Sequence, residues 1–172
     1  IFIMAGGLPL FEPLGNEIAN YKTLIRSVYS KSIGLGGDSS INVSNGKLKI
    51  GPQREGQPFC LGGPKPTLTD VFVYQGKLKL GSKEKAEQAL KILAVDLSIS
   101  VEDVANKIVN LFTELLKNEV DEIIHLVNNK PVYTIKELLH QEKIKPKSLY
   151  IMGGPAKLLA PNIQSKFNLK CS

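Results

Sequence analysis

The hydrophobic pattern of this chain changes period at Ser82, and that change limits the folds the chain can adopt. Before Ser82 the apolar residues come in short runs broken by glycine and proline, which is typical of strands and turns. After Ser82 they recur every three or four residues, as on one face of a helix. A chain with strands first and helices later is predicted to form an α/β fold.

The first half of the chain predicts hairpins. Residues 1–4 and 8–11, on either side of a turn at residues 5–7, predict one hairpin. Residues 21–30 fit a strand or a helix, and a strand is favoured. Residues 40–50 alternate in polarity around Asn45-Gly46, a dipeptide favoured in two-residue hairpin turns. Residues 51–66 are so rich in glycine and proline that they predict a long loop, and long loops in compact domains are usually functional or mobile.

Three helices are predicted after this loop. Ser82 caps a helix running to about residue 95, and Ser100 with Asp103 forms a capping box for a long helix through residue 127, with a kink or break near Asn118 left open. Thr134 marks the start of the third helix, which Pro146 ends.

The end of the chain predicts a strand, a glycine turn and a helix. Residues 148–152 form a compact apolar strand that runs into Gly153-Gly154. Pro155 suits the first turn of a following helix, and Pro161 would end or restart that helix.

Composition excludes several classes of protein. No apolar run is long enough to cross a membrane, and the two cysteines lack the spacing of a zinc or disulfide framework, so we expect a cytoplasmic protein. The net charge of +6 comes from 20 dispersed lysines and only two arginines, which argues against a nucleic-acid partner. The abrupt start in "IFIMAGG" leads us to expect a piece of a longer protein.

The first segment that could bind a ligand is "SIGLGGDSS", residues 32–40. The backbone N–H groups of Gly36 and Gly37 could converge on an anion, with the Ser39 hydroxyl as a further donor, and Asp38 could hold a magnesium-bound water. The alternative is a plain turn in which these side chains bond to the local backbone.

The second segment is the exit of the Gly/Pro loop. Thr67, Thr69 and Asp70 are predicted to alternate onto one face of a strand start, where they either line a site or satisfy free backbone groups. Cys60 is a possible nucleophile, but no histidine lies nearby in the sequence, so a buried, inert thiol is the favoured interpretation.

The third segment is the Gly153-Gly154 turn. A strand that delivers two glycines at the start of a helix lets a flat ligand or a phosphate approach the backbone closely, although ordinary strand-to-helix turns share this pattern. His125 and His140 are isolated on predicted helices and receive no role.

Taken together, these segments resemble the hydantoinase A and 5-oxoprolinase family of ATP-using cyclic-amide hydrolases. The resemblance rests on "GLGGDS" at 34–39, "KIGP" at 49–52, "PFCLGGPKPTLTD" at 58–70 and "IMGG" at 151–154. The chain departs from the family at Arg54-Glu55, where small residues are usual, and has no tyrosine after Cys60. If this loop shapes the substrate pocket, these departures predict a different substrate.

The resemblance implies a fold, a site and a reaction. The fold would be a partial lobe of the actin-like, ribonuclease H-like ATPase superfamily, with residues 1–172 as a single domain from the C-terminal lobe of a longer chain. The reaction would use ATP and magnesium to phosphorylate a ring amide so that water opens it. Partners would be a cyclic amide such as a hydantoin or 5-oxoproline, the rest of the chain and a hydantoinase B-type subunit.

The same resemblance assigns roles to residues. The catalytic pair would be Asp38 and Asp70, with Asp38 also the metal residue. The residues that would bind ATP are Gly36, Gly37, Ser39, Gly153 and Gly154. The residues that would form the substrate loop are Cys60, Gly62, Gly63, Thr67 and Thr69. Two alternatives stay open: a subunit of the ATP-dependent ketone carboxylase type, and a non-catalytic actin-like module that binds nucleotide.

Overall fold

The computed structural model describes residues 1–13, 15–18, 21–129 and 143–172. These residues form the mixed α/β fold that the change of period predicts. Short paired strands come first and four helices follow, and the two strands of a parallel pair come directly before and after the last helix in the sequence. The chain divides into two compact units, Ile1–Ile33 and Gly34–Ser172, which we describe separately. The single-domain assignment stays a prediction.

The first unit consists of two-residue strands. β1 (Met4–Ala5) and β2 (Leu8–Pro9) form the predicted N-terminal hairpin. The further pairs are antiparallel: β3 (Phe11–Glu12) with β6 (Ser27–Val28), and β4 (Glu17–Ile18) with β5 (Tyr21–Lys22). The strand predicted over residues 21–30 is therefore two strands, because Leu24 between them has a left-handed backbone with φ of 55° that no continuous strand adopts.

The second unit opens with the predicted hairpin. β7 (Ile41–Ser44) and β8 (Lys47–Ile50) pair in register around Asn45 and Gly46, whose φ angles of 52° and 69° are those that a two-residue hairpin turn requires. The loop over residues 51–66 contains one regular turn, the 3₁₀ helix η1 (Phe59–Leu61).

The structure corrects the interpretation of the loop exit. Thr67 is the N-cap of α1 (Leu68–Tyr74): its side chain accepts from the Asp70 backbone N–H, and the Asp70 carboxylate accepts from the Thr67 backbone N–H. This reciprocal capping box satisfies donors that a helix start leaves free. Thr67, Thr69 and Asp70 therefore start a helix and do not share one face of a strand.

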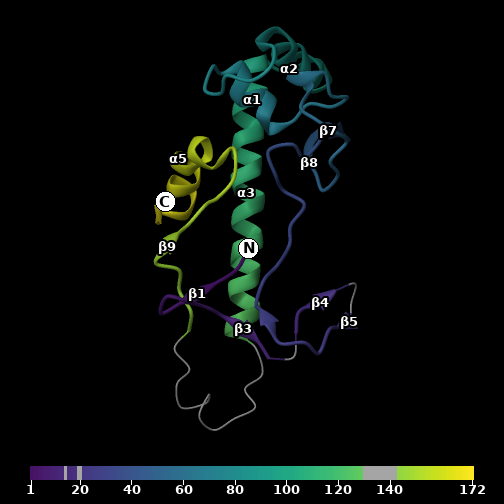
Figure 1. Cartoon of the computed structure of the whole chain (residues 1–172). Coiled ribbons are helices and arrows are strands. Elements are labelled where there is room, and N and C mark those ends of the chain that lie inside the picture. The colour runs from purple at the N-terminus through teal and green to yellow at the C-terminus, as the bar shows by residue number, and fades with distance from the viewer. Residues whose placement is uncertain (14, 19–20, 130–142) are drawn as a thin grey trace. The chain divides into compact units, whose positions relative to one another are not determined.

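The two longer helices begin where predicted. Ser82 caps α2 (Lys83–Leu97), and Ser100 caps α3 (Val101–Asn128). α3 continues through Asn118 without a break, and α1 and α2 lie beside its N-terminal end (Figure 1). The helix predicted from Thr134 lies outside the described residues.

The C-terminal segment is a parallel strand–helix–strand unit formed by β9 (Ser148–Leu149), α5 (Ala156–Phe167) and β10 (Lys170–Cys171). β9 is shorter than the predicted strand over residues 148–152. α5 runs through Pro161, contrary to the prediction. Proline removes one backbone hydrogen bond from a helix interior, while Leu159 and Ile163, on either side of Pro161, are buried and hold the helix against the core.

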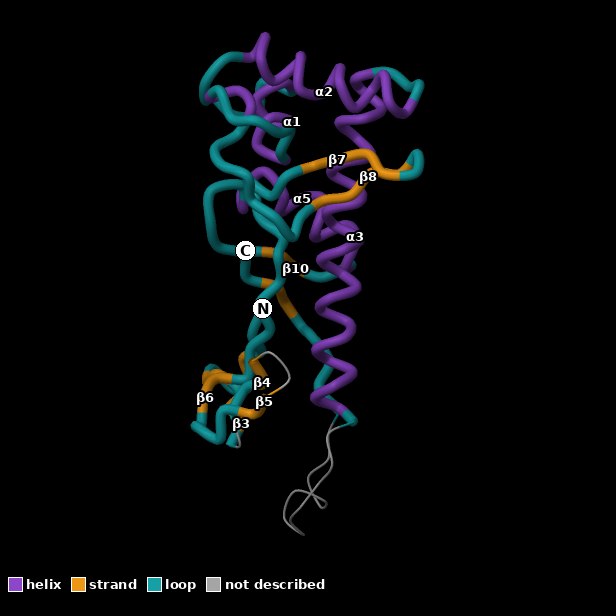
Figure 2. Tube along the Cα trace, turned by 90° about the vertical axis from the view of Figure 1, so that its right-hand side faces the viewer, coloured by secondary structure: helices purple, strands orange, loops and turns teal. Residues whose placement is uncertain are grey.

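One hydrophobic core holds the second unit together. The β7–β8 hairpin and all four described helices contribute to it, with α5 packed along α3 (Figure 2). Its largest fully buried apolar side chains are Phe72, Ile41, Leu68, Leu90, Ile108 and Ile163. Both α1 and α5 pack into this core, and the candidate site lies at the starts of these two helices.

Candidate functional site

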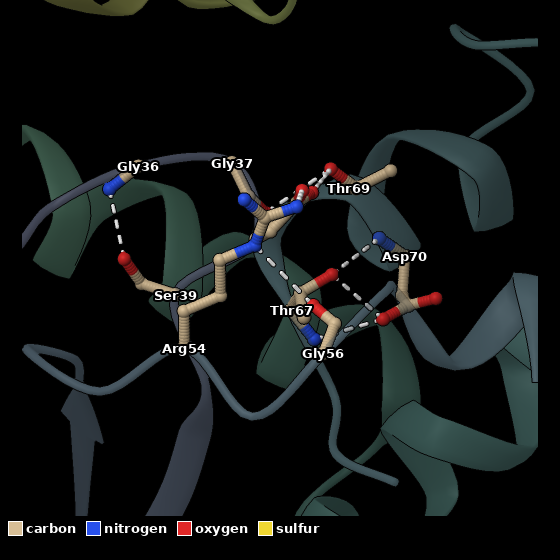
Figure 3. Close-up of polar contacts among 9 residues, drawn as sticks. Gly36, Gly37, Ser39, Arg54, Gly56, Thr67, Thr69 and Asp70 are labelled. Atoms are coloured by element: carbon tan, nitrogen blue, oxygen red, sulfur yellow. Dashed lines mark hydrogen bonds and ion pairs between the residues drawn. The ribbon is translucent and has the colours of Figure 1, made fainter. Parts of the chain in front are cut away.

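The segment before β7 folds into a tight turn at Gly36-Gly37. The Ser39 hydroxyl accepts the Gly36 backbone N–H at 2.9 Å (Figure 3). The same hydroxyl donates to the Gly34 carbonyl at 3.3 Å, and the Ser39 backbone N–H donates to the Gly36 carbonyl at 3.2 Å. Ser39 is thus a buried turn-forming residue, and Gly36 uses its N–H within the turn. Contact of Ser39 and Gly36 with a cofactor stays a prediction.

Thr69, in the first turn of α1, ties this corner to the helix. Its backbone N–H and its hydroxyl each donate to the Gly37 carbonyl at 3.0 Å, and the hydroxyl also lies 3.1 Å from Asp38 Oδ1. The hydroxyl has one proton to share between these two acceptors. Thr69 therefore sets the position of the Asp38 side chain, which the sequence assigned to chemistry.

Arg54 is the residue of this site to which the sequence gave no role. Its Nη2 pairs with Asp38 Oδ2 at 2.9 Å, and its Nε lies 3.4 Å from the Gly56 carbonyl (Figure 3). The arginine side chain is 68% exposed and the aspartate side chain 32% exposed. An ion pair this open to water contributes little to stability, so both groups can exchange partners.

The start of α5 meets the same corner. A Cβ atom on Gly37 would lie 3.2 Å from Thr69 Oγ1 and 3.3 Å from Pro155 Cγ, which is tighter than most Cβ contacts, so the small size of glycine suits this close approach. Pro155 directly follows Gly153-Gly154. The Gly36-Gly37 turn and the residue that follows Gly153-Gly154, which are far apart in the sequence, thus lie side by side. A shared ligand site at this place stays a prediction.

Gly153 and Gly154 themselves are exposed. Gly153 has φ of +121°, a conformation that side chains rarely adopt, and a Cβ atom on either residue would meet nothing within 4 Å. Backbone with open space beside it is accessible to a flat or charged ligand.

Asp70 is fully buried. One carboxylate oxygen accepts from the Phe59 and Thr67 backbone N–H groups and from the Thr67 hydroxyl, at 2.8–3.2 Å, and the other accepts from the Cys60 backbone N–H at 2.7 Å. These four bonds join the Gly/Pro loop to the start of α1. The geometry therefore favours a structural role for Asp70, and its catalytic role stays a prediction.

Cys60 lies in the same buried region, 2% exposed. Burial first, and then the neighbouring Asp70 carboxylate as hydrogen-bond acceptor and negative charge, together raise the pKa of its thiol to about 12. A thiol that stays protonated at neutral pH is a poor nucleophile, in agreement with the inert cysteine that the sequence favours.

The reactivity of Cys60 can be measured in a Cys171→Ser variant, in which no other cysteine of this chain remains. At pH 8 we expect a thiol reagent to label native Cys60 at least about 100-fold more slowly than the unfolded chain, since the native thiolate is scarce and buried. The reciprocal Cys60→Ser variant reports on the half-buried Cys171. Fast labelling of Cys60 in the native protein would show an activated thiol instead.

The same shift predicts a pH dependence. Because the native pKa is raised, the protonated thiol stabilises the fold fully below the pKa of the unfolded chain, and this contribution is lost as the pH rises toward 12.

Gly62 and Gly63 complete the loop. Gly62 caps η1 through its N–H to the Phe59 carbonyl, and Gly63 lies so close to the Gln57 backbone that a Cβ atom there would overlap it. Both glycines therefore serve the packing of the loop in the structure, and their contact with a substrate stays a prediction.

Exposed glycine backbone at the start of a helix is a feature of many proteins that bind phosphate groups, because the backbone N–H groups there can face an anion. The comparison with protein families agrees with this class. The pattern of the hydantoinase/oxoprolinase family matches residues 11–172, and the chain belongs to that family. Its members are ATP-dependent hydrolases of cyclic amides.

Two further findings limit what this chain can be. A comparison with curated proteins finds no match. In the described part of the chain, every helix is too short or too polar to cross a membrane.

Proposed function

We propose that the unit Gly34–Ser172 forms part of an actin-like ATP-binding lobe in an enzyme that opens the ring of a cyclic amide. The contact of Gly37 with Pro155 carries this proposal, because it joins the Gly36-Gly37 and Gly153-Gly154 corners at one place. Family membership supplies the use of ATP and the class of reaction.

The residues present fit a nucleotide. Gly153 and Gly154 leave open space where side chains would stand, so the adenosine part of ATP can lie against their backbone. Gly37, packed between Thr69 and Pro155, keeps the Gly36-Gly37 turn, on the phosphate side, close to the Gly153-Gly154 turn, on the adenosine side. When bound, ATP supplies the phosphoryl group that activates the ring amide toward water.

Asp38 fits a magnesium ion bound with phosphates. The described residues contain no cluster of three or more histidine, cysteine, aspartate or glutamate side chains that could form a complete cage for a metal. Magnesium is commonly held through one or two carboxylates together with the phosphates of its ligand. Asp38, partly exposed at the corner and oriented by Thr69, is the carboxylate that we assign to this task.

The remaining residues position this corner. Thr69 holds the Asp38 side chain, and Asp70 anchors the first turn of α1 from which Thr69 projects. The loop that contains Cys60, Gly62 and Gly63 is pinned to the same turn through Asp70, so we place the substrate beside it.

The test is an ATP-dependence assay on the intact protein, with and without a hydantoinase B-type subunit. We expect ring opening of 5-oxoproline or of a hydantoin, coupled to release of ADP. Coupled ADP release with a ketone and bicarbonate, and none with cyclic amides, would assign the protein to the carboxylase type. Nucleotide binding without turnover of either would indicate a non-catalytic module.

Replacing Asp38 with asparagine is expected to lower the ATPase rate by about 10–100-fold, the usual effect of weakening a metal site, with a much smaller change in substrate KM. Asparagine preserves the size of the side chain and removes its charge. The matched control is Asp96→Asn, which removes the same charge from the exposed surface of α2. An unaltered rate for Asp38→Asn would leave Asp38 as a turn-forming residue only.

A further inference from the structure

Arg54 stands out because of its charge and its place. It is the only arginine between residues 34 and 172, since the other, Arg26, belongs to the first unit and lies over the Phe11 ring. The guanidinium of Arg54 is at the candidate site, paired with Asp38, and its side chain is largely exposed. A guanidinium has five N–H donors, of which the described residues engage two.

We propose that Arg54 binds a carboxylate carried by the ring substrate, so that the enzyme takes acidic rings of the 5-oxoproline kind in preference to uncharged hydantoins. This inference rests on the proposed function, and it names the substrate class and a specificity-determining residue. The two kinds of ring for which the family is named differ in charge as well as in the ring itself: 5-oxoproline carries a carboxylate at neutral pH, and the unsubstituted hydantoin ring carries none.

The geometry of Arg54 supports a carboxylate ligand. The planar guanidinium presents parallel N–H groups that match the two oxygens of a carboxylate. Arg54 already holds a carboxylate oxygen, Asp38 Oδ2, at 2.9 Å. Because that pair is open to water and weak, a substrate carboxylate can share or take over the guanidinium without a large loss.

The position of Arg54 supports the same conclusion. Arg54 belongs to the Gly/Pro loop, and the later part of this loop is fixed to α1 by the bonds of Phe59 and Cys60 with Asp70. Because the Arg54 guanidinium pairs with Asp38, a substrate carboxylate bound to Arg54 would place the ring next to Asp38, where the proposed chemistry occurs.

The experiment measures binding of two rings that differ only in charge: 5-oxoproline and its carboxamide, 5-oxoprolinamide. Titration calorimetry on the intact wild-type protein should show the carboxylate binding about 10–100-fold more tightly than the carboxamide, the range of a charge-assisted hydrogen bond. In Arg54→Gln this preference should disappear, and in Arg54→Lys, which keeps the charge and loses the planar fork, it should be intermediate. Arg26→Gln, the matched control, should keep the full preference.

Each other outcome has a distinct meaning. Equal binding of the two rings by the wild type, or no measurable binding of 5-oxoproline, would overturn the inference. A loss of ATP affinity in Arg54→Gln with the ring preference intact would also overturn it, and would assign Arg54 to a phosphate. An Arg54-dependent preference in a protein that never opens a ring would support the inference while the proposed function fails.

Discussion

Replacing Asp70 with alanine is expected to lower the free energy of unfolding by about 3–5 kcal/mol, the range for breaking a buried network around a charge. The substitution would leave the Phe59, Cys60 and Thr67 backbone N–H groups and the Thr67 hydroxyl without their acceptor. Each unsatisfied buried donor costs about 1–3 kcal/mol, less whatever water can recover. Urea-induced unfolding, followed by far-UV circular dichroism of the helices, measures the change.

Asp103→Ala is the matched control. Asp103 occupies the same third position of a capped helix, bonded to Ser100 at the start of α3, but it is exposed. Loss of an exposed capping interaction costs only about 0.5–2 kcal/mol. If Asp70→Ala destabilised the protein no more than Asp103→Ala, and instead abolished turnover, the predicted catalytic role of Asp70 would replace the structural one.

The capping box of α1 also shows why part of the fold escaped prediction. The residues Thr67-Leu68-Thr69 alternate polar and apolar, which favours a strand. Thr67 also stands three residues before the acidic Asp70, which favours a helix start. The apolar run Val71–Val73 fits either. The deciding contacts come from the η1 backbone, which adds two donors to the Asp70 carboxylate and lies eleven and ten residues earlier.

Local signals predicted other elements well. Asn45-Gly46 specified a hairpin, and Ser82 and Ser100 specified helix starts, because each depends on residues within one turn of the chain. Pro161 misled the prediction, since its cost to α5 is offset by burial of Leu159 and Ile163, which only the tertiary fold determines.

The sequence named residues of the candidate site but not the contacts between them. The sequence pointed to Asp38 and to both glycine corners, and the resemblance grouped them. Two contacts bring its segments side by side: the exposed ion pair of Arg54 with Asp38, and the close approach of Pro155 to Gly37. Both join segments that no local pattern relates, so a single sequence carries no physical signal for them beyond the small size of Gly37.

Replacing Gly153 with valine is expected to weaken nucleotide binding at least about 100-fold, which fluorescence titration with a labelled ATP analogue on the intact protein would measure. Two effects act in the same direction. A branched side chain would fill the open space beside the exposed backbone, and φ of +121° at this position is strained for any residue with a Cβ atom.

Two further variants separate these effects. Gly154→Ala adds one methyl group to the same open space without the positive φ, so a loss of affinity there reports contact between the ligand and this turn. Gly76→Val places valine at another glycine of positive φ with open space, after α1, and reports the cost of backbone strain alone.

Unchanged affinity in both Gly153→Val and Gly154→Ala would remove the nucleotide from this corner. Equal losses in Gly153→Val and Gly76→Val, with Gly154→Ala unaffected, would mean that strain and not contact disturbs the protein. A graded loss, large for Gly153→Val, smaller for Gly154→Ala and absent for Gly76→Val, is the result that the geometry of the α5 start requires, because only a ligand lying against this backbone distinguishes the three positions.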